Sequence, residues 1–131
     1  MAVRLTAALI ARDEEAHIGA CLESLTGLVE EVVVVDTGSG DKTPLIAARA
    51  GARVIPAPWQ EDFACARNIG LAQAQGEWIL YVDADERVSL TGDLHAVLSV
   101  PDAIAAHVQF RASSRLTPYR EHRLFRNRPD I

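Results

Sequence analysis

Three carboxylates directly follow a short apolar run in the middle of the chain. Trp78 to Val82 are apolar, and Asp83, Asp85 and Glu86 come next. Such a cluster at the end of a buried strand is unfavourable unless a positive charge lies beside it. Alternate residues of extended backbone point the same way, so Asp83 and Asp85 are expected to face one point. Hard carboxylate oxygens suit Mg²⁺ or Mn²⁺, which complete their shells with water and phosphates. The triplet predicts a divalent-metal site that neutralises a diphosphate leaving group.

Apolar patterning divides the rest of the chain into alternating strands and helices that must position these carboxylates. Asp13 is expected to cap the first helix, and Gly51 and Gly76 to end the second and third. We expect strands at 4–11, 31–36, 52–57 and 77–82, helices at 14–25, 44–50, 61–76 and 93–100, and two antiparallel strands at 103–112 and 119–127.

This alternation predicts an α/β fold with a mostly parallel, doubly wound, Rossmann-like sheet and helices on both faces. The strands near the C-terminus are expected to be antiparallel. Polar clusters follow three of the parallel strands, as ARDEE, DTGSGD and DADE. Ligands of such sheets bind outside the carboxyl ends of the strands, so these clusters are expected to converge on one crevice.

The composition is that of a soluble globular protein. The 131 residues are 49% hydrophobic and 24% charged, as expected for a single domain over 1–131. The net charge of −5 argues against a nucleic-acid partner. Cys21 and Cys65 lack paired spacing, so we expect a reducing compartment and two buried thiols. No segment approaches the roughly 20 apolar residues of a transmembrane span. We expect a cytoplasmic location, which includes the cytoplasmic membrane face.

Several familiar motifs match in part and fail on context. DTGS, which begins at Asp36, is an aspartic-protease signature, but those enzymes are all-β and Asp36 lies between a strand and a helix. GSGDKT lacks the glycine that a phosphate loop needs before Lys42. No G-x-G-x-x-G follows the first strand. An EF-hand beginning at Asp83 would need a ligand and a glycine where Arg87 and Val88 stand. The DADE segment is the motif that remains.

Taken together, several segments resemble the family 2 glycosyltransferases of the GT-A fold, in particular their N-terminal, nucleotide-sugar-binding portion. They are IARDEEAHIGACLESL, EVVVVDTGSGDKTPLIAARAGARV, PWQEDFACARNIGLAQAQGEWILYVDADE and HRLFRN. The spacing is intact from Leu5 to Glu86. The resemblance implies transfer of a sugar, with inversion, from a nucleotide-diphosphate donor to an acceptor hydroxyl. It also implies Mn²⁺ or Mg²⁺ as cofactor at the D-x-D motif.

The resemblance implies roles for five residues. Asp36 would contact the base edge of the nucleoside, and Glu14 would help to hold the same nucleoside. Arg67 would approach the base or the diphosphate from the third helix. Asp83 would lie near the ribose and the metal, and Asp85 would be the principal metal ligand. From its position alone, Glu14 could equally complement a helix N-terminus, and Arg67 could serve in a surface ion pair.

An inverting transfer needs a base within hydrogen-bond reach of the acceptor hydroxyl. Family members are longer, and their base lies beyond the strand that HRLFRN resembles, so the catalytic residue is unknown. We expect the chain to be truncated at the C-terminus and to cover only the donor-binding half, with a glycan, lipid or protein acceptor. Two alternatives stay open: a non-catalytic nucleotide-sugar-binding or interaction module, and a nucleotidyltransferase. An unpaired sheet edge near the end of the chain would allow a homodimer.

Overall fold

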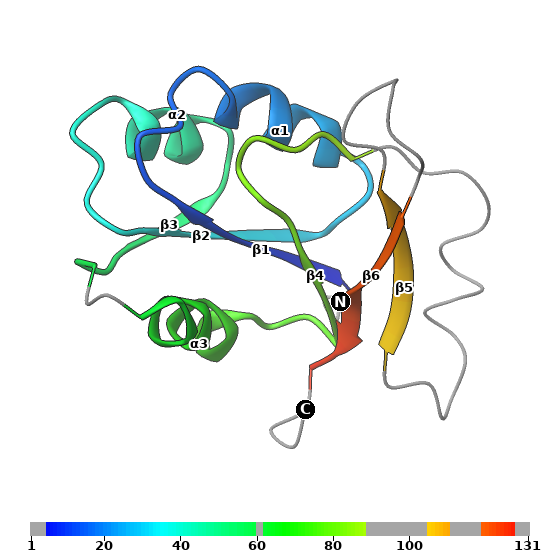
Figure 1. Cartoon of the computed structure of the whole chain (residues 1–131). Helices are drawn as coiled ribbons and strands as arrows, with labels where there is room; N and C mark the ends of the chain where they lie inside the picture. The colour runs from blue at the N-terminus through cyan, green and yellow to red at the C-terminus, as the bar shows by residue number, and fades with distance from the viewer. Residues whose placement is uncertain (1–4, 60–61, 89–104, 111–118, 128–131) are drawn as a thin grey trace.

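The computed structural model describes residues 5–59, 62–88, 105–110 and 119–127 (Figure 1). They form one sheet in the order β3-β2-β1-β4-β6-β5. β1 pairs in parallel with β2 and β4, and β2 with β3, whereas β6 is antiparallel to β4 and β5. This arrangement confirms the predicted α/β fold class. The strands are β1 (Leu5–Ala11), β2 (Glu31–Asp36), β3 (Arg53–Pro56), β4 (Trp78–Tyr81), β5 (Ala105–Phe110) and β6 (Tyr119–Arg126); the helices are α1 (Ile18–Leu25), α2 (Thr43–Arg49) and α3 (Phe63–Gln73).

Helices cover both faces of the sheet. α1 and α2 lie over one face and α3 over the other (Figure 1). Val34 of β2 belongs to the apolar cluster beneath α1 and α2, whereas Val35 packs with Ala66 and Ile69 of α3. A β-branched run that is buried on both faces is typical of an interior strand in a parallel sheet. None of the helices in the described residues is long and apolar enough to cross a membrane.

The first helix begins later than predicted. α1 starts at Ile18 rather than near Glu14, and His17 at its N-cap makes no side-chain capping hydrogen bond. Asp13 is therefore not the predicted cap. Its φ of +54° places it in the left-handed region, which aspartate tolerates better than most residues.

The two glycines predicted to end helices behave differently. Gly51 follows α2 with a φ of +92°, as predicted. Gly76 does not end α3, because the helix stops at Gln73 and Ala74 is the C-cap. A Cβ at Gly76 would lie 2.6 Å from Thr6 Oγ1 and 2.8 Å from the Thr6 backbone nitrogen. Glycine is required there by a close approach to β1.

Three further predictions concern single elements. β6 is paired on both sides, by β4 and β5, so the basic strand near the end of the chain is not the predicted unpaired edge. Cys21 is buried as predicted, whereas Cys65 is only partly buried because its part of α3 reaches the surface. The helix predicted at 93–100 lies outside the described residues.

Candidate functional site

The carboxyl ends of β1, β2 and β4 lie at one edge of the sheet. Ala11, the last residue of β1, is in register with Asp36, the last residue of β2. On the other side of β1, the Val82 N–H donates to the Ala8 carbonyl oxygen at 3.1 Å just after β4 ends. The polar segments that follow these strands therefore leave the sheet at the edge where such folds bind ligands.

Asp13 joins the loop after β1 to the loop after β2. Its carboxylate accepts a hydrogen bond from the Gly40 N–H at 2.8 Å, and its own N–H donates to Ser39 Oγ at 3.0 Å. Each bond spans more than 25 residues of sequence. The two bonds hold Asp13 in its left-handed conformation and fix one loop against the other.

Two neighbouring bonds continue this connection into α2. The Glu14 N–H donates to Thr43 Oγ1 at 2.9 Å, and the Glu15 N–H donates to Asp41 Oδ2 at 3.2 Å. Hydrogen bonds from the Thr43 hydroxyl and from backbone N–H groups lower the pKa of Asp41. The Glu14 backbone is thus fixed at the predicted edge with its side chain partly buried, and its contact with a nucleoside stays a prediction.

Asp36 is buried at the end of β2, with 8% of its surface exposed. Its carboxylate accepts hydrogen bonds from the Ser39 N–H at 3.3 Å and from Ser39 Oγ. A carboxylate has about four acceptor positions, so Asp36 retains capacity for a donor group on a ligand. The carboxylate is held in place by the loop that also carries the bonds to Asp13.

The acidic turn, residues 83–86, differs from its predicted geometry. β4 ends at Tyr81, and the Glu86 N–H donates to the Asp83 carbonyl oxygen at 2.9 Å. The Asp83 N–H in turn donates to Glu86 Oε1 at 2.8 Å. These two bonds close a turn, so the extended backbone from which Asp83 and Asp85 were expected to face one point is not formed. The pairing of the two carboxylates at one ion stays a prediction. Ala84 is buried in the core, while Asp85 is exposed.

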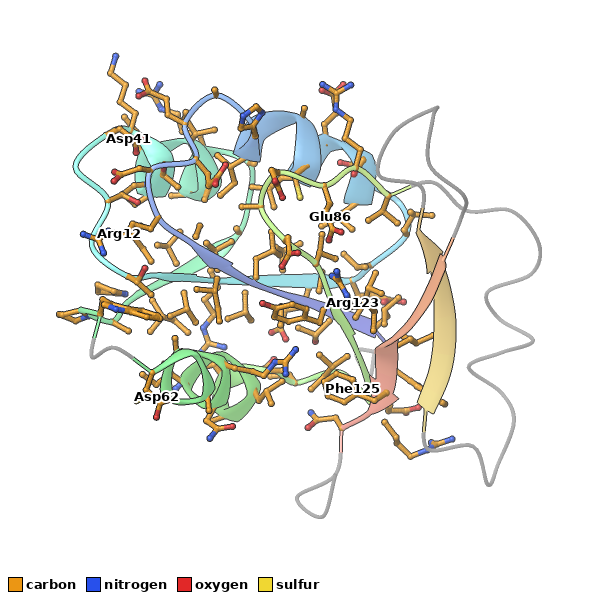
Figure 2. All side chains as sticks on the ribbon, viewed as in Figure 1. Arg12, Asp41, Asp62, Glu86, Arg123 and Phe125 are labelled. Carbon is orange, nitrogen blue, oxygen red and sulfur yellow. The ribbon has the colours of Figure 1, made fainter. Side chains whose placement is uncertain are left out.

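Arg123 of β6 supplies the positive charge that the acidic cluster requires. Its Nη1 lies 3.0 Å from Glu86 Oε1 and its Nη2 3.5 Å from Asp83 Oδ2. The Arg123 side chain is only 9% exposed, compared with 48% for Asp83. Figure 2 labels Arg123 and Glu86 beside the end of β4. Sequence reasoning missed this residue, although the demand of the carboxylates for a cation and the HRLFRN segment were both visible.

Tyr81 connects Arg123 to α3. The Arg67 guanidinium carbon lies 4.3 Å from the centre of the Tyr81 ring, and that of Arg123 lies 5.4 Å from it. Burial and the Asp83 carboxylate raise the pKa of Tyr81 against the opposing effect of the two arginines. The structure thus brings Arg67, predicted from sequence, to the base of the acidic turn. It reaches this position by packing on an aromatic ring.

The acidic turn also affects the thiol of Cys21, which lies beside it. Cys21 of α1 is buried, and its thiol donates to the Asp83 carbonyl oxygen at 3.6 Å. Burial, followed by the nearby carboxylates of the turn, raises the pKa of Cys21 from 9.0 to about 12. The carboxylates of the turn thus add to the effect of burial on this thiol.

The residues of the turn fit a divalent ion that is held mainly by a ligand. No group of three His, Cys, Asp or Glu side chains in the described residues could hold a metal ion. Asp85 is exposed, and within the described residues its carboxylate makes no hydrogen bond or ion pair. Mg²⁺ is commonly held by one or two carboxylates together with substrate phosphates. Asp85, with Asp83 beside it, matches that donor set.

The comparisons with known proteins agree with this geometry. The sequence model of glycosyl transferase family 2 matches residues 6–127. A TPR repeat-containing protein of Synechococcus elongatus is 45% identical over 127 residues, which cover 94% of this chain and 32% of that protein. An uncharacterized glycosyltransferase of Rickettsia bellii is 35% identical over 86 residues, covering 66% of this chain and 29% of that protein. The chain thus spans about a third of the length of these curated relatives.

A solved structure shares the fold. Glucosyl-3-phosphoglycerate synthase from Mycobacterium tuberculosis, in complex with Mn²⁺, uridine diphosphate and glucosyl-3-phosphoglycerate, superposes with a TM-score of 0.57 at 28% identity. The match covers 65% of this chain and 36% of that one. The sheet described above is thus the Rossmann-like sheet of a GT-A fold. With the family model matching nearly the whole sequence, the chain belongs to glycosyl transferase family 2.

Proposed function

We propose that this protein transfers a sugar, with inversion, from a nucleotide-diphosphate donor to an acceptor hydroxyl, and that Mn²⁺ or Mg²⁺ assists the transfer. Membership of the family supports the reaction class. The synthase from M. tuberculosis, a structural neighbour, was solved with Mn²⁺ and uridine diphosphate, which supports a nucleoside diphosphate and a divalent ion as ligands here. A bound divalent ion would offset the charge that develops on the leaving diphosphate.

We assign the donor-binding roles to five residues of this chain. Asp36 accepts a hydrogen bond from the base, and Glu14 lines the same nucleoside site from the loop after β1. Arg67 offers its guanidinium to the base or the diphosphate. Asp83 lies toward the ribose and the ion, and Asp85 is the principal metal ligand. The acceptor and the catalytic base are outside this assignment, because the chain spans about a third of its curated relatives.

One observation carries the proposal. The exposed Asp85 carboxylate has no partner within the described residues, although the carboxylates on either side of it contact Arg123. A carboxylate that is left open in a cluster whose other charges are compensated is suited to a ligand cation. It stands at the strand-end edge where the loops after β1 and β2 also emerge.

Thermal denaturation with a panel of nucleotides, with and without Mn²⁺, tests the proposal. A ligand at 100 times its dissociation constant should stabilise the folded state by about 2.7 kcal/mol. We expect nucleoside diphosphates and their sugars to stabilise the chain only when Mn²⁺ is present.

Other outcomes would favour the alternatives. Preferential stabilisation by nucleoside triphosphates would favour a nucleotidyltransferase. Metal-dependent binding of nucleotide sugars by the full-length protein, without transfer to any glycan, lipid or protein acceptor, would favour a binding module. For an active protein, the anomeric proton signals of the product in an NMR spectrum report whether the transfer inverts.

A further inference from the structure

We propose that Arg123 is a positioning residue that acts as the internal cation of the acidic turn. It holds Asp83 and Glu86 in the metal-free protein and releases Asp83 to the divalent ion when the donor binds. The inference rests on the proposed function, because it concerns the same ion. It adds a residue that lies about 40 positions away from the acidic turn in the sequence.

The contacts that Arg123 makes with Glu86 and with Asp83 are unequal. Glu86 is bound through both of its oxygens, at 3.0 Å from Nη1 and 3.3 Å from Nη2. Asp83 is reached by one nitrogen at 3.5 Å, the long end of hydrogen-bond range. Forked arginine–carboxylate pairs are the stronger and more directional kind. Glu86 therefore anchors the guanidinium, and Asp83 is the partner that an incoming ion can take over.

Burial makes this arrangement durable. Arg123 is 9% exposed and also donates to the Tyr81 carbonyl oxygen at 3.3 Å. Glu86 is 22% exposed, whereas Asp83 is 48% exposed. The anchored half of the cluster is shielded from water, while the half to be released faces the solvent from which the ion arrives.

The charge balance gives the inference its direction. A divalent ion at Asp83 and Asp85 would stand close to the Arg123 guanidinium and be repelled by it. Removing the positive charge of Arg123 should therefore lower the free energy of unfolding of the metal-free protein and raise its affinity for the ion. A merely structural arginine predicts only the loss of stability.

Thermal denaturation of the full chain in EDTA, in Mn²⁺ alone, and in Mn²⁺ with uridine diphosphate distinguishes these cases. Arg123→Gln should melt below the wild type in EDTA and recover most of that loss in Mn²⁺. Its apparent affinity for Mn²⁺ should be roughly threefold to tenfold tighter than that of the wild type, a range set by the partial exposure of Asp83. If Arg123→Gln is unfolded in EDTA, Mn²⁺ should restore the folded state.

Two further variants complete the design. Arg87→Gln removes the same formal charge from an exposed side chain beside the turn, and it should change neither the melting temperature nor the Mn²⁺ response appreciably. Glu86→Gln frees Arg123 to pair with Asp83 and should weaken the Mn²⁺ response below that of the wild type.

The inference is overturned if Mn²⁺ fails to restore the stability of Arg123→Gln, or if Arg123→Gln and Arg87→Gln respond equally to Mn²⁺. In either case the proposed function still holds, provided that the wild type binds Mn²⁺ and uridine diphosphate. If no variant and no wild-type protein responds to Mn²⁺ with uridine diphosphate, both ideas fall.

Discussion

Gly76→Ala is expected to destabilise the protein strongly, because of how closely β1 and the start of β4 approach it. A Cβ at this position would lie 2.6 Å from Thr6 Oγ1, 2.8 Å from the Thr6 nitrogen and 2.9 Å from the Trp78 carbonyl oxygen. Two of these three atoms belong to the main chain, so no rotamer change can relieve the overlap. Accommodation requires moving paired strands apart.

The expected magnitude follows from this geometry. Overpacking of a tight interior typically costs about 1–3 kcal/mol, and the main-chain overlaps place Gly76→Ala at about 3 kcal/mol. The Gly76 N–H also donates to Thr6 Oγ1 at 2.9 Å, and this buried bond would be strained by the same movement. For a chain of this size, the melting temperature should fall by roughly 10 °C.

Two other glycines serve as matched controls. Gly51→Ala meets no atom within 4 Å but must adopt a φ of +92°, so it should cost about 1 kcal/mol through backbone strain alone. Gly19→Ala lies within α1, 3.6 Å from Ile46 Cγ2, and should be neutral or stabilising by up to about 1 kcal/mol. Urea denaturation would rank the stabilities of the three variants, provided that their m-values are equal. A Gly76→Ala protein as stable as Gly51→Ala would refute the argument from close approach.

Asp85→Asn is expected to abolish stabilisation by Mn²⁺ plus nucleotide while leaving the metal-free melting temperature level or higher, and a large metal-free loss would mean that Asp85 is structural. Asp36→Ala should weaken nucleotide binding, measured by calorimetry, but spare binding of inorganic diphosphate plus metal; equal weakening of both ligands would contradict the proposed contact of Asp36 with the base. The same substitution should cost about 1–2 kcal/mol in urea denaturation, because the N–H and hydroxyl of Ser39 lose their acceptor. The pKa of Cys21 is raised from 9.0 in the unfolded state to about 12 in the folded state, so above pH 9 the unfolded chain loses the thiol proton first. The protonated thiol therefore contributes fully to the free energy of unfolding below pH 9, and this contribution is lost as the pH rises toward about 12. The urea midpoint of Cys21→Ala should therefore fall less steeply than that of the wild type above pH 9, and in alkylation with iodoacetamide near pH 8.5 Cys65 should react well before Cys21.

The sequence was sufficient to predict those parts of the fold that depend on local pattern. The valine run of 31–36 is β-branched and apolar on both sides, and it became an interior strand with both faces buried. The alternation of strands and helices then fixed the mostly parallel sheet and the edge at which its polar loops emerge. Asp36 and the acidic turn were found because they directly follow such strands.

The features that the sequence did not predict correctly depend on partners that are distant in the sequence. Asp13 has the type and position of a helix cap, but Ser39 and Gly40 of another loop compete for its hydrogen bonds and hold it outside α1. Arg123 reaches the acidic turn only because β6 pairs antiparallel with β4 in a register that sets Leu124 against Leu80. No local pattern specifies that register.

The position of β6 has a consequence for how the protein is made. During synthesis, β4 can pair with β1 as soon as it emerges from the ribosome, but its other edge waits for β6. About 45 residues separate the end of β4 from the end of β6, and at roughly 5–20 residues per second their translation takes roughly two to nine seconds.

Throughout that interval the nascent chain presents an open, apolar strand edge, the kind of surface that pairs with other chains and is recognised by chaperones. The carboxylates of the acidic turn are synthesised before Arg123, which follows them by about 40 residues. The acidic turn is therefore completed late, when β6 arrives both to close the edge of β4 and to bring its arginine to Asp83 and Glu86.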